Sequence, residues 1–242
     1  MNVEPNVISF GRSFVKGQYR CPEARIREYA QIEVYEEYDG RHNSTNVINT
    51  SDMAGARALY AWYHEGPHER ASQNAMRTDP MIRSQLERTE DRYLGSIDDK
   101  DAQLLSSELG PLLSLFMRID WVGPAVATKI LHLHKPDLIP VIDSHVLKFY
   151  AGRGTENLSK PEQARLVLDT VDQIRVTLRD NQEEFKGLAR RLTNLPIPLT
   201  RTRMHDILVW SIWKWDLRNG PLEGCAEKGR RDVTTLGCWS GN

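Results

Sequence analysis

The chain has 242 residues, 40% of them hydrophobic, and 32 Lys and Arg against 33 Asp and Glu give it a formal charge of −1. This is the composition of a globular protein that can bury a sizeable apolar core without disulfide support. The three cysteines, Cys21, Cys225 and Cys238, are too few and too scattered for a disulfide framework, a zinc ribbon or a four-cysteine iron–sulfur cluster. The charge balance also removes the simplest argument for nucleic-acid binding, so that function has to rest on motifs.

Targeting signals are not recognisable in the sequence. Its N-terminus lacks the apolar core of a secretory signal, and no later run approaches the roughly 18 apolar residues that a membrane span needs. An odd number of cysteines is typical of reduced intracellular thiols. We therefore expect a cytoplasmic protein, associated with the nucleoid if bacterial, that has no membrane partner and acts as a monomer.

The chain divides into three parts by composition. Residues 1–50 are punctuated by Gly and Pro and predict an irregular segment packed on the body, with one short strand within residues 31–38, where apolar residues alternate with Glu. Helical periodicity prevails over residues 51–218 and predicts a mostly α body. Residues 219–242 are rich in Gly, Thr, Ser and basic side chains, which predicts a loose C-terminal tail.

Capping residues, prolines and apolar periodicity indicate where the helices of the body begin and end. The clearest helix starts after Ser159, where Pro161 and Glu162 complete a capping box. The other expected helices run from residues 50–52 to Pro67, over 68–92 as two modest helices that break at Asp79-Pro80, from 98–101 to 117 with a kink or boundary at Gly110-Pro111, from Pro124 to 134, from Ser144 to 150, from Gln182 to 192, and onward from Thr200.

The segment Val122-Gly123-Pro124 predicts a tight turn between two helices, because Pro124 suits the first position of a new helix. This helix-hairpin-helix occupies about residues 101–134. The start of its second helix presents main-chain amides with partial positive charge, which suits a phosphate oxygen. Val122, Gly123, Pro124 and Ala125 are therefore candidate DNA-contact residues, and a pure packing or protein-contact element is the alternative.

Asp143 lies between an extended apolar run, Leu138–Ile142, and the helix expected from Ser144, which is an N-cap position. Asp is common at N-caps for reasons unrelated to catalysis. A purely structural role is therefore the alternative to a chemical one.

Around these residues the chain resembles the helix-hairpin-helix (HhH-GPD-like) DNA glycosylase superfamily, whose hairpin is followed by a Pro-rich loop and a Val-Asp-x-His-Val-like segment. The corresponding residues are Val122-Gly123-Pro124-Ala125 and Val141-Ile142-Asp143-Ser144-His145-Val146, and the eighteen residues from Ala125 to Asp143 match the family's distance from hairpin to catalytic carboxylate. The resemblance covers about thirty residues. It implies two helical lobes with the active site between them and Asp143 facing the hairpin.

The chain departs from the family pattern at one position, because the lysine that acts as an amine nucleophile in the bifunctional members falls at Ala125. The family's optional iron–sulfur cysteines are also absent. The resemblance therefore implies a divergent monofunctional member that hydrolyses an N-glycosidic bond in double-stranded DNA with an extruded base, needs no cofactor and leaves an abasic site. Oxidised, alkylated, mismatched and phage-type hypermodified bases all remain open as substrates.

That reaction gives candidate roles to three residues. Cleavage passes through an oxocarbenium-like sugar, which the carboxylate of Asp143 would stabilise while it orients or deprotonates the attacking water. His145 is a secondary candidate for polarising a phosphate or the water. Lys129, one helical turn after Ala125, is either a solvated lysine, a phosphate contact, or a displaced amine that restores Schiff-base chemistry.

An extruded base needs aromatic or apolar walls around it. For these walls the sequence offers four aromatic residues of its N-terminal half, among which nothing selects: Tyr35, Tyr38, Trp62 and Tyr63.

Other noticeable groups have simpler explanations. His132 and His134 lie on different faces of a helix, which is poor geometry for a shared metal, and no metal site is expected. Trp210 and Trp213 belong to an apolar helix and are expected in the core. Residues 186–231 hold ten Lys and Arg against four Asp and Glu, which is either a face for the DNA backbone or a solvated surface.

Two further classes of function stay open on the sequence alone. One is a non-catalytic helix-hairpin-helix module that binds DNA through phosphates. The other is a protein-interaction or nuclease-accessory domain.

Overall fold

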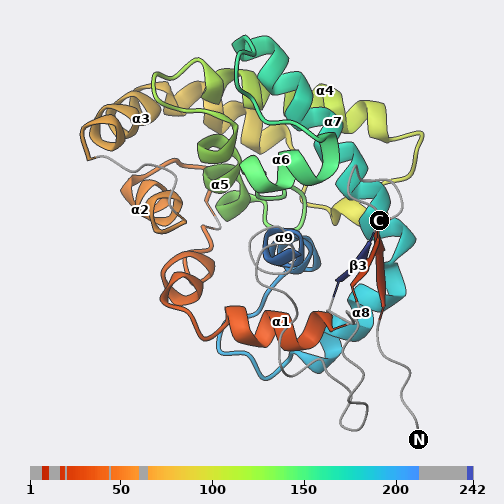
Figure 1. The fold of residues 1–242 in the computed structure, drawn as a ribbon. Coiled ribbons are helices and arrows are strands. Elements are labelled where there is room, and N and C mark those ends of the chain that lie inside the picture. The colour runs from red at the N-terminus through yellow and green to blue at the C-terminus, as the bar shows by residue number, and fades with distance from the viewer. Residues whose placement is uncertain are drawn as a thin grey trace, which may run out of the picture.

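The computed structural model describes residues 7–10, 17–19, 21–43, 45–59, 65–212 and 239–241. This part of the chain is mostly helical (Figure 1), which confirms the predicted fold class at that level. No helix within it is long and apolar enough to cross a membrane.

The helices and strands follow one another along the chain with short connections. The helices are α1 Pro22–Tyr29, η1 Tyr35–Asp39, α2 Thr50–Ala58, α3 Glu65–Arg88, η2 Leu94–Ser96, α4 Ala102–Met117, α5 Pro124–His134, α6 Ser144–Ala151, α7 Lys160–Asp180, α8 Gln182–Arg191 and α9 Arg201–Ser211. The strands are β1 Ile8–Phe10, β2 Gly17–Tyr19 and β3 Trp239–Gly241.

The strands form one small antiparallel sheet in the order β1-β2-β3. Tyr19 of β2 lies opposite Ile8 of β1 on one side and opposite Trp239 of β3 on the other. This corrects two expectations, since part of the N-terminal segment is regular sheet and helix, and residues 239–241 of the tail are a strand. Three-residue strands are too short to stand out in a sequence pattern.

The strand expected within residues 31–38 is also wrong, because residues 35–39 form the π-helical turn η1. Tyr35 and Tyr38 are both buried while Glu36 and Glu37 between them are exposed. A spacing of three between buried residues is helical, and the alternation with Glu imitates a strand only over a few positions.

Two prolines that were expected to interrupt helices lie inside continuous ones. Pro80 lies within α3 and Pro111 within α4, and both are exposed. A proline inside a helix leaves one main-chain carbonyl without its partner, and on an exposed face water can bond that carbonyl. The buried side of each helix, including Ile82 and Leu86 in α3, continues past the proline and holds it together.

The predicted helix starts are confirmed at the positions that place the site. Asp143 caps α6, Ser159 and Glu162 form the capping box of α7, and the Thr200 side chain caps α9. Helix α5 packs against α2 and α4, and α9 packs against α1, α6 and α8. In Figure 1, α9 lies at the centre of the view with α1 below it and α6 above it.

The core does not divide as the two predicted lobes would require. Buried side chains from β1 through α9 form one continuous cluster, and the second cluster within the described ranges is small, made of Tyr38, Leu133 and Val141. The candidate site therefore lies within one packed body.

Candidate functional site

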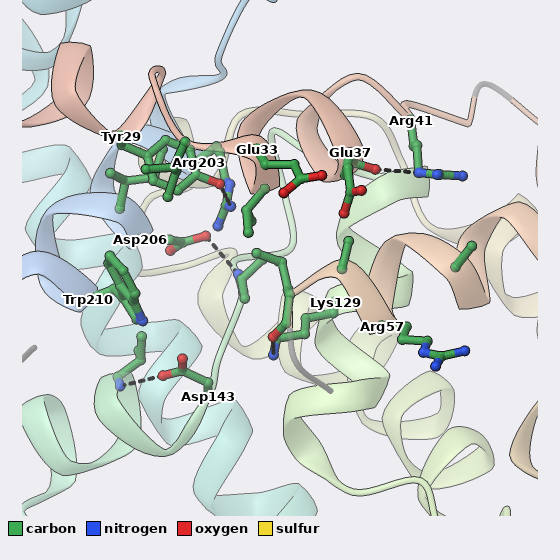
Figure 2. Close-up of a pocket in the computed structure, with 18 residues that line it drawn as sticks. Tyr29, Glu33, Glu37, Arg41, Arg57, Lys129, Asp143, Arg203, Asp206 and Trp210 are labelled. Carbon is green, nitrogen blue, oxygen red and sulfur yellow. Dashed lines mark hydrogen bonds between the residues drawn. The ribbon is translucent and has the colours of Figure 1, made fainter. Parts of the chain in front are cut away.

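A cavity of about 680 Å³ opens between the N-terminal helices and the helices α5, α6 and α9 (Figure 2). Its volume falls within the range of about 300–1,000 Å³ that is usual for small-molecule sites. The residues lining it that matter for chemistry are Tyr29, Leu59, Lys129, Asp143, Asp206 and Trp210. Two candidates from the sequence, Asp143 and Lys129, thus face one cavity.

Asp143 is half-buried and divides its carboxylate between two surroundings. Its Oδ1 accepts hydrogen bonds from the amides of His145 at 2.8 Å and Val146 at 3.0 Å, which is the N-cap arrangement. Its Oδ2 accepts no hydrogen bond from any residue the structure describes. The same side chain can therefore cap α6 and offer an oxygen to the cavity.

The extended segment before Asp143 is fixed from two neighbouring helices. The amide of Val141 donates to Oδ2 of Asp206 in α9 at 2.7 Å, and the amide of Ile142 donates to Oγ1 of Thr128 in α5 at 3.0 Å. Because both amides are buried, these bonds satisfy groups that water cannot reach. The direction in which the chain enters Asp143 is set by α5 and α9 together.

Lys129 is buried, with 5% of its surface exposed, and its Nζ donates to the main-chain carbonyl of Leu59. Leu59 is the C-cap of α2, where unpaired carbonyls carry partial negative charge. Burial lowers the pKa of the Lys129 amine to about 8, and the charge of Asp143 partly opposes this shift. A substantial fraction of the amine is therefore neutral near pH 8, and its burial rules out a solvated role.

The walls of the cavity are aromatic and apolar, but the aromatic residues are not those suggested by the sequence. Tyr29 and Trp210 line the cavity, and Trp210 is half-buried there rather than part of the core. Tyr35 and Tyr38 are fully buried and do not line it. Trp62, Tyr63 and Trp213 lie outside the described residues.

Tyr38 has a different position in the site. Its hydroxyl donates to the main-chain carbonyl of Lys129 at 2.7 Å. Burial raises the pKa of Tyr38 well above its ordinary value, so the phenol remains a donor at every physiological pH. It anchors the middle of α5 to η1.

A buried cluster of Tyr29, Asp39 and Arg203 closes one end of the cavity, and sequence reasoning missed it. Nε of Arg203 donates to Oδ1 of Asp39 at 2.7 Å, and the same guanidinium donates to the hydroxyl of Tyr29 at 2.6 Å. The Tyr29 hydroxyl in turn donates to Oδ2 of Asp39 at 2.7 Å. These residues come from α1, η1 and α9, so no sequence spacing connects them.

Two arginines lie at another edge of the cavity, opposite Trp210 in Figure 2. Nε of Arg41 donates to the carbonyl of Glu37, and its NH1 donates to Oγ of Ser51 at 3.3 Å. Arg57 of α2 is exposed. Both guanidinium groups lie where a charged ligand would approach the cavity.

The hairpin lies outside the cavity, and its residues differ in what they offer to solvent. Val122 and Pro124 are buried, whereas Gly123 and Ala125 are partly exposed. A Cβ added to Gly123 would meet nothing within 4 Å, and its φ of −106° is open to any residue. Only the backbone around Gly123 and Ala125 is accessible to a phosphate, and the side chain of Val122 is not.

The histidines have separate positions. His145 does not line the cavity, and its main-chain amide is what bonds Asp143. Nδ1 of His132 bonds the carbonyl of Ile139, whereas His134 pairs with Asp52. Within the described ranges there is no group of three or more His, Cys, Asp or Glu that could hold a metal ion.

The fold and the site define a mostly helical protein in which a carboxylate and an amine face one cavity. The chain belongs to DUF6308, a family of unknown function, whose model matches residues 13–212. That range contains the hairpin, Lys129 and Asp143. No curated protein matches the chain significantly, and no solved structure does.

Proposed function

We propose that the protein is a DNA glycosylase that hydrolyses the N-glycosidic bond of a damaged or modified base and leaves an abasic site. The observation that carries this proposal is the carboxylate of Asp143, whose Oδ2 is unbonded and faces a cavity of about 680 Å³. Asp143 lies eighteen residues after Ala125 of the hairpin, as in the glycosylases that the sequence resembles.

Asp143 is proposed to act on the sugar. As the bond to the base breaks, positive charge develops on the deoxyribose, and a fixed carboxylate lowers the free energy of that transition state. Oδ2 is also placed to orient or deprotonate the attacking water. The hydrogen bonds on Oδ1 keep the group from rotating away.

The cavity would hold the extruded base. A base inside a duplex cannot be reached, so the enzyme must take it out of the stack and hold it between flat or apolar surfaces. Tyr29 and Trp210 provide aromatic walls, and Ile207 adds an apolar one. Arg41 and Arg57 at the edge suit the phosphates of the displaced nucleotide.

The hairpin would hold the DNA backbone. Helix α5 begins at Pro124, and the main-chain amides around it carry the partial positive charge of a helix N-terminus. The open space around Gly123 allows a phosphate oxygen to approach the main chain closely. The partner is double-stranded DNA, bound by a cytoplasmic, nucleoid-associated monomer without a cofactor.

The test is release of free base from a panel of duplexes that carry oxidised, alkylated, deaminated, mismatched or hypermodified bases. We expect release from at least one of them, with strand breaks only after alkali for a purely hydrolytic reaction. Asp143→Asn keeps a good N-cap but removes the charge, so it should abolish release while DNA binding and thermal stability persist. Ser159→Ala removes the cap of α7 away from the cavity, and it should leave release unchanged.

A non-catalytic DNA-binding module is the second candidate. It is favoured by the fact that Oδ1 of Asp143 already has a structural task at the start of α6. In that case no duplex of the panel loses a base, and Asp143→Asn binds DNA like the unchanged protein. A duplex that releases its base only with an intact Asp143 excludes this candidate.

A further inference from the structure

Lys129 has a task that base hydrolysis by Asp143 does not use. It lies in the middle of α5, 5% exposed, and lines the cavity together with Asp143. Its Nζ donates to the carbonyl of Leu59, and it forms no ion pair with any residue that the structure describes. A buried ammonium bonded only to a neutral group is unfavourable, because the loss of hydration is not offset by a nearby opposite charge.

A second buried lysine shows the ordinary solution to this problem. Lys135, at the end of the same helix, is 6% exposed, and its Nζ lies 3.0 Å from Oδ1 of Asp91. Lys129 lacks such a partner, and the charge of Asp143 acts on it without a direct pair. A lysine kept partly neutral in an apolar cavity has the properties of an amine nucleophile.

We propose that Lys129 forms a covalent imine with an aldehyde held in this cavity, namely the C1′ aldehyde of an abasic deoxyribose in DNA. The protein then has an abasic-site lyase activity in addition to base hydrolysis. The identity of the aldehyde rests on the proposed function, because hydrolysis of the base at Asp143 leaves that aldehyde beside Lys129.

The reaction balances without a cofactor. The lone pair of the neutral Nζ attacks C1′ of the open-chain sugar, and the carbonyl oxygen leaves as water, so that amine and aldehyde become imine and water. The protonated imine acidifies the C2′ proton, which passes to the carboxylate of Asp143. The bond between C3′ and its oxygen then breaks, its electron pair leaves with the 3′ phosphate, and water later hydrolyses the imine to regenerate Lys129.

The surroundings of Lys129 hold it for such an attack. The hydroxyl of Tyr38 fixes its main-chain carbonyl, and the carbonyl of Leu59 holds its Nζ at the cavity wall. Asp143 enters the same cavity from the start of α6 (Figure 2). The competing role is structural, in which Lys129 only ties α5 to the end of α2, and the experiment distinguishes the two.

The experiment mixes the full-length protein with a duplex that already contains an abasic site and adds sodium borohydride, which reduces an imine to a stable amine. We expect a covalent protein–DNA adduct whose modified peptide contains Lys129. Lys129→Arg retains a cation that can bond Leu59 but forms no stable imine, so the adduct at this peptide should be lost. Lys135→Arg is the matched control, and its adduct should equal that of the unchanged protein.

A pH profile adds a readout that a structural role would not move. Trapping at Lys129 should rise with a midpoint near the pKa of about 8, well below the 10.5 of an ordinary lysine. Asp143→Asn removes a charge that raises this pKa, so the midpoint should shift to lower pH. Melting curves for every variant show whether it is folded.

The outcomes separate the two proposals. An adduct at Lys129 without base release from any duplex supports the inference and contradicts the glycosylase proposal. Base release without an adduct overturns the inference and leaves the glycosylase proposal standing. An adduct that maps to surface lysines, or that persists undiminished in a folded Lys129→Arg variant, also overturns the inference.

Discussion

The buried carboxylate of Asp206 in α9 accepts a hydrogen bond from the amide of Val141 at 2.7 Å, two residues before Asp143. Its other oxygen, Oδ1, lies 3.2 Å from Nδ1 of His205. Asp206 therefore connects a helix near the C-terminus of the described chain to the backbone that carries the candidate catalytic carboxylate.

We predict that Asp206→Ala lowers the free energy of unfolding by about 1–3 kcal/mol, because it leaves a buried amide without an acceptor. It should also reduce base release by more than it reduces DNA binding, since Asp143 loses its fixed position. Asp206→Asn keeps an acceptor oxygen for Val141 and should restore most of both. Urea unfolding and base-release assays measure these effects, and the exposed Asp169→Ala serves as control. Equal activity in all three variants would contradict the positioning role.

The parts of the fold that could be predicted are those that local sequence decides. The starts of α6, α7 and α9 follow from single capping residues, which bond amides two or three positions away. Continuity of α3 and α4 through Pro80 and Pro111 could not be predicted, since tertiary packing of the buried faces outweighs the local penalty of proline.

The site divides in the same way. Asp143 and Lys129 were both recognisable, because they lie on either side of one short, patterned segment. The cavity that joins them was not, since its other walls come from α1, α2 and α9, which meet only in the folded chain. Trp210 illustrates this limit, because an apolar stretch does not reveal that one side of α9 faces a cavity rather than the core.

The hairpin gives a prediction about DNA affinity. Gly123→Ala should change the free energy of unfolding by less than about 1 kcal/mol, because a Cβ there meets no atom within 4 Å and the backbone is extended. It should weaken binding to all duplex sequences alike, because the methyl group occupies the space through which a phosphate approaches. Fluorescence anisotropy with several unmodified duplexes measures this.

Gly110→Ala is the matched control for that experiment. A Cβ at Gly110, inside α4, lies 3.6 Å from Leu168, which is ordinary contact. Alanine there should stabilise the helix by up to about 1 kcal/mol and leave DNA affinity unchanged. Unchanged affinity of Gly123→Ala, or loss confined to one sequence, would argue against a contact between the hairpin and the backbone.

His132 gives a prediction about acid stability. Burial lowers its pKa from 6.5 to about 4, and the charge of Arg203 acts in the same direction. Between these values the unfolded chain binds more protons than the folded one, so stability is complete above pH 6.5 and is lost as the pH falls toward 4. The loss should reach about 3 kcal/mol. His132→Gln should flatten this dependence in urea titrations, while the exposed His42→Gln should not.

The last prediction concerns the stability of the protein at neutral pH and Lys129. Burial lowers its pKa from 10.5 to about 8, so between these values the unfolded chain binds more protons and stability rises with pH. Below pH 8 the folded state therefore bears the full cost of a buried ammonium, about 3 kcal/mol before its bond to Leu59 is counted. Lys129→Met keeps the length and apolar stem without the charge, so it should raise the free energy of unfolding at pH 7 by about 1–3 kcal/mol. It should also remove the rise between pH 8 and 10.5, as urea titrations across that range would detect. Lys135→Met, which breaks a pair with Asp91, should destabilise the protein instead. A Lys129→Met variant that is less stable than the unchanged protein at pH 7 would mean that the lysine is kept for the fold, whereas a gain in stability together with loss of the imine adduct means that it is kept for chemistry.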